Sequence, residues 1–309
     1  MATYYFKDTT SYSISDPGNW YTDMYFGTPA GIVPDFSTNS GVIGDSSTPV
    51  RCDVDSNVTV SNGNTLNVTA GATLYIGNSS YVCVLVISNA STLSLEPGSN
   101  CYITTNAEIN NQSGGIISAT GQFTLQSGSQ LANNGSISIG GTVNIAIGAS
   151  FIHNGFLSTS IGGVLTVYPS TTFSIGVGST IYNDGAFNNY GIINVPNNTT
   201  FTNQRTLINA PAAVFIINNT FSNGGTFNNQ GSALNLNTFN NQGTFINLSA
   251  ITNNGVFNTT AQGVFASSPN SNFNNNNQFI FGSVYNTYFK GKVFPQIPSS
   301  AAFGTAILF

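Results

Sequence analysis

Charge is what this sequence of 309 residues most clearly lacks. Only 5% of its residues are charged, against roughly 25% in an ordinary globular protein. From Ile109 to Phe289 the charged side chains are Asp184 and Arg205 alone. With a net charge of −5 and no cluster of basic residues, the chain is not expected to bind nucleic acid.

Long apolar runs are also missing. No segment approaches the roughly 18 apolar residues that a membrane-spanning helix needs, so membrane insertion is not expected. The N-terminal MATYYFKDTTSYSIS has no apolar segment of signal-peptide length, so either a leader has been trimmed or the general secretory route is not used. Disorder does not explain the low charge either, because 23 Phe and 13 Tyr recur regularly among Ile and Val.

Cysteine is scarce, and an odd number of cysteines does not make a disulfide framework. Cys83 and Cys101 lie about one coil apart in the repeat described below, a spacing that allows them to stack. The favoured interpretation of Cys52, Cys83 and Cys101 is nevertheless unpaired, buried thiols that serve packing. The redox compartment stays open.

What the sequence does contain is a six-residue repeat, clearest from Phe221 to Phe257, that reads apolar-x-Asn-x-Gly-x. Because six is even, the three recurring positions face the same side of an extended chain, whereas a helix would scatter them around its axis. The repeat therefore predicts short strands with apolar and Asn side chains pointing inward. The predicted core ladder comprises Phe201, Phe221, Phe227, Phe239, Phe245, Ile251, Phe257, Asn223, Asn229, Asn241 and Asn253.

Three apolar series extend this repeat into a coil of about 18 to 20 residues. They run as Ile181, Phe201, Phe221, Phe239 and Phe257; as Phe187, Leu207, Phe227 and Phe245; and as Ile193, Ala213 or Phe215, Ala233 and Ile251. We therefore predict an all-β fold, a single-stranded parallel β-helix (solenoid) with three short faces per coil and roughly eleven coils. Parallel crossovers are right-handed in about 98% of cases, and the varied strand spacing of the first half also favours a right-handed coil.

Residues 1–50 differ from the repeat and are expected to form an N-terminal cap or attachment segment, ahead of a solenoid over residues 51–282. The segment contains ISDPGNWYTD and GTPAGIVPD and is followed by VRCDVDSNVTV. The order of Asp16, Pro17, Asn19 and Trp20, then Val33 and Pro34, then Asp53 to Val60, resembles an N-terminal module with a D-P-x-N-W element. That module occurs on structural proteins of phages and viruses and on bacterial surface β-helix proteins.

This resemblance covers about a fifth of the chain and implies a capping or attachment role without catalytic residues. A cap is also expected physically, because uncovered strand edges at the end of a solenoid invite aggregation. Trp20, Tyr21, Tyr25 and Phe26 are the candidates to cover the first coil.

The repeat ends near Gly282, and residues 283–309 are expected to form a C-terminal cap or a docking arm. They bring back charge at Lys290 and Lys292 and finish on an apolar Ala-Ile-Leu-Phe. Such a terminus is expected to be tied down, either on its own chain or on a neighbouring one. The candidate assembly contacts are Trp20, Ile307, Leu308 and Phe309.

No catalytic, cofactor-binding or metal site is predicted. His153, the only histidine, stands where the repeat usually places Asn, so a ladder position is favoured over a catalytic base. Asp184 and Arg205 lie one coil apart and are expected to form a surface ion pair that stabilises little.

The acidic residues at the start of the solenoid are a second candidate for chemistry. Asp53 and Asp55 flank Val54, and with Asp45 they offer the oxygen ligands that calcium accepts. Their spacing matches no calcium-binding motif, so a solvated strand is the favoured interpretation.

Low charge, a continuous repeat and two atypical ends together predict a non-enzymatic structural protein. It would be a virion or extracellular fibre subunit, on a virion or at a cell surface, that self-associates into a homo-oligomer or filament. The alternative is an adhesin for glycans or a surface receptor, with Tyr182, Tyr190, Tyr285 and Tyr288 as candidates for stacking on sugars. A third hypothesis, a polysaccharide-cleaving tailspike, requires two carboxylates about 5 to 10 Å apart on one face.

Overall fold

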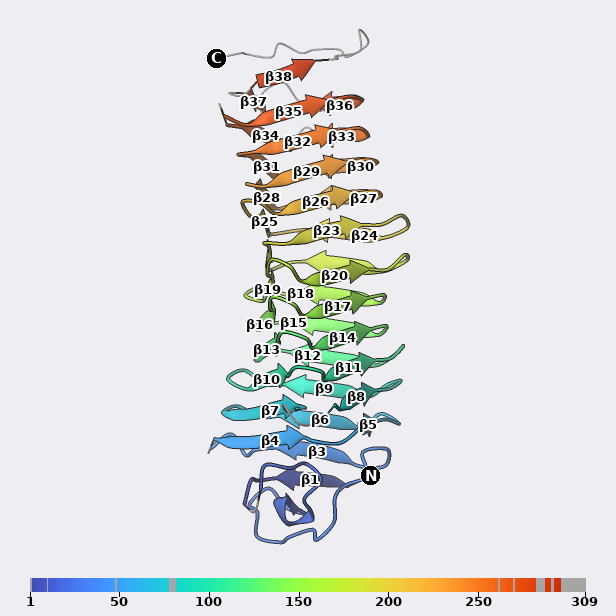
Figure 1. Ribbon diagram of the computed structural model, residues 1–309, viewed down its shortest axis with the longest axis vertical. Coiled ribbons are helices and arrows are strands. Elements are labelled where there is room, and N and C mark those ends of the chain that lie inside the picture. The colour runs from blue at the N-terminus through green and yellow to red at the C-terminus, as the bar shows by residue number, and fades with distance from the viewer. Residues whose placement is uncertain are drawn as a thin grey trace. The chain divides into compact units, whose positions relative to one another are not determined.

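The computed structural model describes residues 2–9, 11–47, 49–77, 82–260, 262–268, 270–281, 287–289 and 292–295. Within these ranges the chain is almost entirely β-strand, and the 3-10 helix η1 (Pro17–Asn19) is the single helical element (Figure 1). Tyr285 and the candidate assembly contacts Ile307, Leu308 and Phe309 lie outside the described residues. The chain forms two compact units, Met1–Leu157 with Gly162–Val164, and Ser158–Ile161 with Leu165–Phe309.

In the first unit three sheets follow the stack of coils, and one strand of each coil joins each sheet. The first sheet has the order β2 (Trp20–Tyr21), β1 (Thr3–Phe6), β3 (Ser40–Ile43), β6 (Thr65–Val68), β9 (Thr92–Leu95), β12 (Ile116–Ala119) and β15 (Ser136–Ile139). The second contains β4 (Val50–Val54), β7 (Ala72–Ile76), β10 (Asn100–Ile103), β13 (Gln122–Leu125) and β16 (Thr142–Ile145). The third contains β5 (Val58–Val60), β8 (Val84–Ile87), β11 (Glu108–Asn111), β14 (Gln130–Asn133) and β17 (Ser150–His153).

The second unit repeats this arrangement. Its first sheet contains β21 (Thr180–Asn183), β24 (Thr200–Asn203), β27 (Thr220–Asn223), β30 (Thr238–Asn241), β33 (Val256–Thr259) and β36 (Gln278–Phe281). The second contains β22 (Ala186–Asn189), β25 (Thr206–Asn209), β28 (Thr226–Asn229), β31 (Thr244–Asn247), β34 (Val264–Ser267) and β37 (Thr287–Phe289). The third contains β23 (Ile192–Val195), β26 (Val214–Ile217), β29 (Ser232–Asn235), β32 (Ala250–Asn253), β35 (Asn272–Asn275) and β38 (Lys292–Pro295). In the sequence, β18 (Phe156–Thr159) and β19 (Val164–Val167) cross the boundary between the units, and β20 (Thr172–Ile175) belongs to the second unit.

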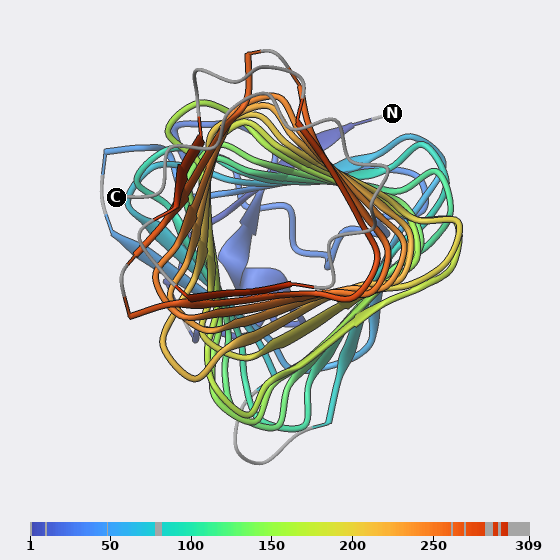
Figure 2. The same ribbon diagram turned by 90° about the horizontal axis from the view of Figure 1, so that it is seen from above.

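The predicted fold class is confirmed, because each unit is a single-stranded parallel β-helix with three short faces per coil. Seen along the stack, the coils of each unit turn around a three-sided core (Figure 2). The predicted register also holds, since Phe221 pairs with Phe239 and Phe227 pairs with Phe245. Phe215, and not Ala213, continues the third series, because it pairs with Ile193 on one side and with Ala233 on the other.

The core consists of inward side chains from all three faces. Strands of the second unit alternate buried and partly exposed residues, as the two-residue period of an extended chain requires. Phe221 is fully buried, and its ring centroid lies 5.3 Å from that of Phe201 and 5.0 Å from that of Phe239. Full burial of one such side chain stabilises the fold by about 2 to 3 kcal/mol. The stacked Phe columns are therefore the main source of stability in this unit.

The glycine of the repeat is explained by the close approach of the preceding coil. A Cβ atom at Gly243 would lie 2.0 Å from the carbonyl oxygen of Gly225, and one at Gly255 would lie 2.0 Å from the carbonyl oxygen of Asn237. Neither distance is compatible with a side chain of any size. The fifth position of the repeat is therefore the corner where successive coils touch through their backbones.

The early coils of the first unit are longer than the 18 to 20 residues expected from the repeat. Cys101 pairs with Leu74, 27 positions earlier, and with Phe123, 22 positions later. Cys83 and Cys101, whose spacing allowed them to stack, therefore do not pair in the register, because the longer coils move Cys83 out of it. The Sγ atom of Cys83 instead lies 3.0 Å from the backbone carbonyl oxygen of Val54 and donates to it.

The N-terminal segment packs around Trp20, which is fully buried. The indole Nε1 donates to the carbonyl oxygen of Ile14 at 2.8 Å, and the ring meets Phe6 and Phe36 edge-on. Strand β1 pairs in parallel with β3, and β3 with β6, so residues before position 50 already extend the stack of coils. Trp20 thus covers the first coil as expected, but its burial removes it from the candidate assembly contacts.

Candidate functional site

The inward Asn side chains form hydrogen-bonded columns along the stack. In one column, Asn183 Nδ2 donates to Asn203 Oδ1 at 2.7 Å, Asn203 to Asn223 at 2.7 Å, and Asn223 to Asn241 at 2.8 Å. Each Nδ2 also donates to a backbone carbonyl of the next coil, as Asn203 does to Thr226 at 3.1 Å. These amides are fully buried. They satisfy one another, so the column holds the coils in register and offers nothing to a ligand.

Two more columns in the second unit follow the same rule. One contains Asn189, Asn209, Asn229 and Asn247, and the other Asn235, Asn253 and Asn275. The predicted ladder residues Asn229 and Asn253 occupy these columns. Asn235 begins its column, because Ile217 precedes it in the register and cannot donate to it. This position explains why the Oδ1 atom of Asn235 is buried without a partner.

His153 occupies a ladder position, as the repeat predicts. It is fully buried, pairs with Asn133 in the register, and its Nδ1 lies 3.0 Å from Asn133 Nδ2. Since an amide NH2 only donates, Nδ1 accepts here, and the neutral ring then carries its proton on Nε2. The side chain therefore replaces an Asn in the column and is held away from solvent.

The acidic residues near position 50 are not arranged as a metal site. Among the described residues, no group of three His, Cys, Asp or Glu side chains is placed to hold a metal ion. Asp53 accepts two hydrogen bonds from Arg51, at 2.8 Å each, and Asp55 accepts one from Ser15 at 3.0 Å. The expectation of a solvated strand is wrong for Asp53, which is 8% exposed because the segment before Ser15 packs over it.

The predicted ion pair between Asp184 and Arg205 is present, with Arg205 Nε 3.0 Å from Asp184 Oδ1. Both side chains are solvated, at 50% exposure for the arginine and 34% for the aspartate. An exposed pair of this kind contributes about 0 to 1 kcal/mol. It provides neither the second carboxylate nor the shielded setting that a glycosidase requires.

A stack of aromatic rings and one guanidinium group, which the sequence did not suggest, lies on the outer face of β4, β7 and β10. The guanidinium carbon of Arg51 lies 4.7 Å from the ring centre of Tyr12 and 4.6 Å from that of Tyr75. The ring of Tyr75 stacks on that of Tyr102 at 5.2 Å. Asp53 fixes the arginine through its paired hydrogen bonds. The stack therefore fastens the N-terminal segment to the first coils by cation–π contacts.

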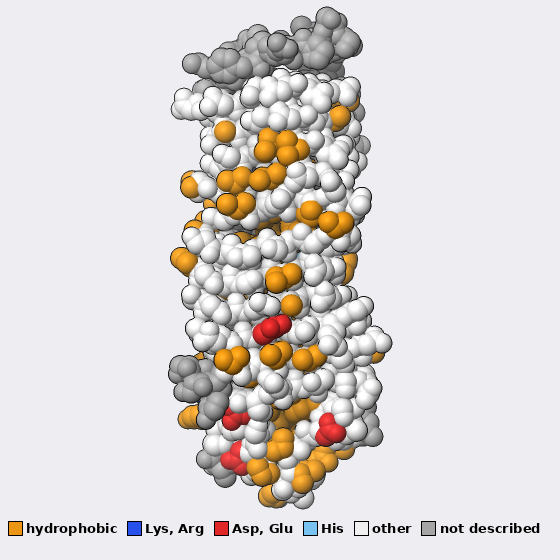
Figure 3. All heavy atoms as spheres, turned by 45° about the vertical axis from the view of Figure 1, so that its right-hand side comes forward, with side chains coloured by type: hydrophobic (Ala, Val, Ile, Leu, Met, Phe, Trp, Pro, Cys, Tyr) orange, Lys and Arg blue, Asp and Glu red, His pale blue; other side chains and the backbone are white. Residues whose placement is uncertain are grey.

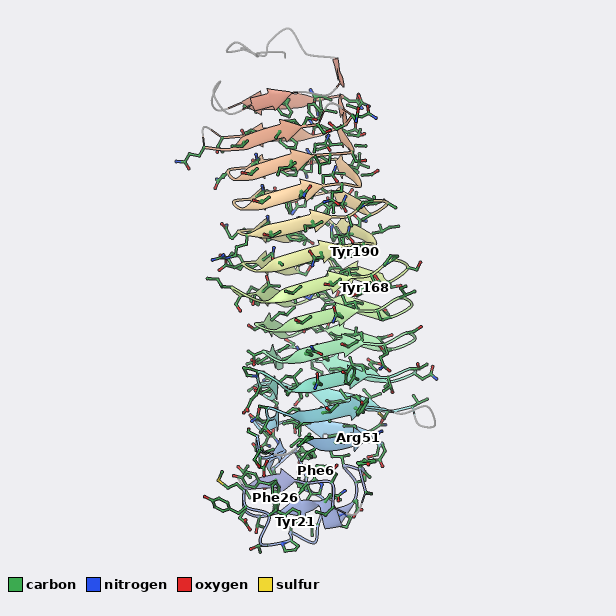
Figure 4. All side chains as sticks on the ribbon, turned by 90° about the vertical axis from the view of Figure 1, so that its left-hand side faces the viewer. Phe6, Tyr21, Phe26, Arg51, Tyr168 and Tyr190 are labelled. Carbon is green, nitrogen blue, oxygen red and sulfur yellow. The ribbon has the colours of Figure 1, made fainter. Side chains whose placement is uncertain are left out.

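The tyrosines proposed for sugar binding are only partly described. Tyr190 is 43% exposed, and its ring stacks on that of Tyr168 with centroids 6.1 Å apart and planes within 16° (Figure 4). Tyr182 is 39% exposed. Tyr288 lies in β37, and its side chain is not described. The pair of Tyr168 and Tyr190 is the one described aromatic platform in the second unit that two coils build together.

Aliphatic side chains gather on the outer face of β23, β26 and β29. Ile192 pairs with Val214, and Ile216 with Leu234, so the four lie on three successive coils. Ile192 is 61% exposed, and Leu236, just beyond β29, is 42% exposed. Figure 3 shows one face of the molecule, on which hydrophobic side chains form patches and no Lys or Arg is visible. We call these five residues the aliphatic patch.

The N-terminal loop, residues Thr22–Thr28, follows β2. Its Tyr25 is 84% exposed and its Met24 is 52% exposed. Tyr25 therefore does not cover the first coil, contrary to the sequence-based expectation, because the loop carries it away from the core.

All three cysteines are unpaired and buried, as expected. Burial raises the pKa of the Cys83 thiol to about 11, and it also raises the pKa values of the Cys52 and Cys101 thiols well above the usual range. A reactive thiolate requires the opposite shift. These side chains serve packing.

Comparison with known proteins leaves the function open. No protein-family model matches the chain, and no curated protein matches it. A solved structure that resembles it is the TibC-catalyzed hyper-glycosylated TibA55-350 fragment, with 15% sequence identity and a TM-score of 0.25. The similarity covers 79% of this chain and 92% of that chain. None of the described residues forms a helix long and apolar enough to span a bilayer.

Proposed function

We propose that this protein is a non-enzymatic structural β-solenoid, a virion or extracellular fibre subunit that associates with copies of itself. The interior of the first unit is filled mainly by aliphatic side chains, and that of the second by Phe columns and by Asn columns whose amides bond to one another. Any function therefore belongs to the outer faces and the two ends.

The observation that carries this proposal is the chemistry of the outer surface beyond Ile109. Asp184 and Arg205 are the only charges there before Lys290, and they neutralise each other. Charge repulsion between copies, which normally keeps soluble proteins apart, is therefore weak on this surface. The aliphatic patch and the exposed Asn and Thr side chains provide contacts in its place.

An enzymatic role has little support in the described residues. A polysaccharide-cleaving enzyme needs a pair of carboxylates that share one face. Asp184 is bound to Arg205, Asp53 is bound to Arg51, and His153 is buried in a column. A virion or cell-surface location agrees with a self-associating structural role and belongs to the same proposal.

The proposal is tested by the size and appearance of the purified chain. We expect light scattering to show a mass that rises with protein concentration, and electron microscopy to show assemblies of several copies. A chain that stays monomeric at every concentration would contradict the structural role.

A second candidate function, glycan binding, is favoured by the stacked pair of Tyr168 and Tyr190. Sugars pack their apolar faces on exposed aromatic rings, and two coils place these rings side by side. We expect the double variant Tyr168→Ala/Tyr190→Ala to lose any binding seen on a glycan array, and Tyr182→Ala to retain it. An array on which the unaltered chain binds no glycan removes this candidate.

A further inference from the structure

The aliphatic patch is one continuous surface on the third sheet of the second unit. Ile192 is the register partner of Val214, and Ile216 is the register partner of Leu234. Val214 and Ile216 stand two residues apart in β26, so both side chains point to the outer face of the sheet. Leu236 extends the surface at the corner just beyond β29. Three successive coils therefore build a single apolar area.

The backbone of this face leaves a partner only side chains to contact. Strands β26 and β29 each pair with a strand on both sides, so a partner cannot add a strand there. The outer faces of two sheets can instead stack about 10 Å apart, with their side chains interdigitated. The β-branched side chains of Ile192, Val214 and Ile216 have few rotamers and lose little entropy when they are covered. The face therefore suits a flat, apolar partner surface.

The charges of the second unit lie away from the patch. From Ser158 to Phe281 the charged side chains are Asp184 and Arg205. Both stand at the corner between the first and second sheets, where they form an ion pair. No charge beside the patch attracts a charged ligand, and none repels a second copy. A copy of this chain offers the same flat, neutral and apolar surface.

The size of the face sets the strength of such a contact. The third sheet contains five strands from β23 to β35. With strands about 4.8 Å apart and about five residues across, the face covers about 400 Å² on each copy. Two copies would bury about 800 Å² in total, below the roughly 1,200 Å² at which stable interfaces begin. The contact is therefore expected to be weak and to depend on protein concentration.

We propose that the aliphatic patch binds the aliphatic patch of a second copy of this chain, with the two third sheets face to face. The same residues meet from both sides, so the contact is isologous and closes at two copies. The exposed Asn194 and Asn274 would lie at its polar rim. The inference rests on the proposed self-association and names one surface that produces it. A longer assembly requires a further contact between such pairs.

The test uses charged variants of the full chain, because a charge in an isologous contact meets the same charge on the other copy. The first variant is Ile192→Lys/Leu236→Lys, and the second is Ile192→Asp/Leu236→Asp. The control, Ile147→Lys/Ile161→Lys, changes aliphatic side chains outside the patch that are 58% and 66% exposed. Sedimentation velocity over a range of protein concentrations measures association. Circular dichroism and thermal unfolding verify that each variant folds as the unaltered chain does.

We expect the unaltered chain and the control to form dimers over the same range of concentrations. Each charged patch variant alone should need about tenfold or more protein to reach the same degree of association, because like charges then face each other. An equimolar mixture of the Lys variant and the Asp variant should form dimers again, since opposite charges meet across the contact. Added salt should weaken this mixed dimer, because salt screens the attraction.

Each other result has a separate meaning. If the unaltered chain associates and both patch variants do so equally well, the inference is overturned while the proposed self-association stands. If both patch variants lose association and their mixture does not regain it, the patch meets a different surface, and the pairing of patch with patch is overturned. Loss of association in the control would show an effect of charge anywhere on the surface and would also overturn the inference. A chain that never associates would overturn both proposals.

Discussion

Replacing one buried asparagine should destabilise the protein far more than replacing its neighbour in the sequence. Asn228 and Asn229 are adjacent in β28, but only Asn229 points inward. Asn229 accepts a hydrogen bond from Asn209 at 2.8 Å and donates to Asn247 Oδ1 at 2.9 Å and to the carbonyl oxygen of Ala250 at 2.8 Å. The substitution Asn229→Ala removes all three bonds.

The size of the expected destabilisation follows from the hydrogen-bonding groups that the substitution leaves without a partner. Asn209 Nδ2 keeps a hydrogen bond to the carbonyl oxygen of Ser232 at 3.0 Å, so the bond that it loses to Asn229 lowers the stability only modestly. Asn247 Oδ1 loses its donor inside the core, which costs about 1 to 3 kcal/mol, and each hydrogen bond contributes about 1 kcal/mol. We therefore expect Asn229→Ala to lower the free energy of unfolding by about 3 to 5 kcal/mol. Asn228→Ala removes an Oδ1 that has no partner, so its effect should stay within about 0.5 kcal/mol.

Urea unfolding followed by circular dichroism measures both changes. The variant Asn229→Asp separates hydrogen bonding from cavity formation. It keeps the volume and the acceptor for Asn209 but sets a carboxylate against Asn247 Oδ1, so it should be at least as damaging as Ala. Equal midpoints for the variants at positions 228 and 229, or an unharmed Asn229→Asp protein, would refute the column as a source of stability.

Three further predictions test other parts of the structure. Arg51→Ala leaves the buried Asp53 without its two hydrogen bonds and should lower the free energy of unfolding by about 2 to 3 kcal/mol, measured in urea. Arg205→Ala breaks an exposed ion pair and should lower it by less than about 1 kcal/mol. Equal losses in the two variants would contradict the role of burial. Gly243→Ala places a Cβ atom against the preceding coil and should lower the stability by about 1 to 3 kcal/mol or more, while Gly27→Ala, whose Cβ would lie 3.8 Å from its nearest neighbour, should unfold at the same urea concentration as the unaltered chain. The three thiols should not react with Ellman's reagent at pH 8 in the folded protein and should all react in denaturant. Because burial raises the folded-state pKa of Cys83 from 9.0 to about 11, its contribution to stability is fully present below about pH 9 and is lost as the pH rises through about 11. Reaction of the folded protein with the reagent at pH 8 would contradict the burial of the thiols. A free energy of unfolding that does not change between about pH 9 and pH 11 would contradict it as well.

The stretch from Phe221 to Phe257 was predictable in detail because its repeat has an even period and no insertions. Because the period is even, Phe221, Phe227 and Asn223 all point inward, whatever the conformation of the turns between the strands. Consecutive six-residue segments leave only two residues for each corner, and these were visible as the Gly positions. Strand pairing in the structure follows the same spacing. The interior ladder was therefore predictable from the sequence.

The first unit was less predictable because its turns vary in length. Counting residues does not reveal which strand lies on which once a turn contains extra residues. The sequence therefore left open a stacking of Cys83 on Cys101 that the structure excludes. The stack of Tyr12, Arg51 and Tyr75 was missed for the same reason. The signal was present as aromatic residues at Tyr75 and Tyr102, which the structure pairs directly, but it is visible only when the coil length of 27 positions is known.

The conformation of the N-terminal loop was also beyond the sequence pattern. An Asp two residues before Tyr25 is compatible with many turns, and exposure depends on where the loop leaves the core. The positive φ of Phe26 decides the outcome, because it reverses the direction of the side chain relative to its neighbours. A periodic sequence pattern does not predict the φ angle of a single loop residue.

The amide columns have a direction along the coils. In the columns that contain Asn183, Asn189 and Asn235, each Nδ2 donates to the Asn of the following coil. Each such coil therefore offers amide donors toward the C-terminus and amide acceptors toward the N-terminus, and its parallel strands have the same directionality. The acceptor of the first Asn in a column is used only where the preceding coil supplies a donor. Thr159 Oγ1 donates to Asn183 Oδ1, whereas Ile217 cannot donate to Asn235, whose Oδ1 is buried without a partner. A polar residue on the preceding coil therefore completes the column, and an aliphatic residue leaves its first acceptor unused.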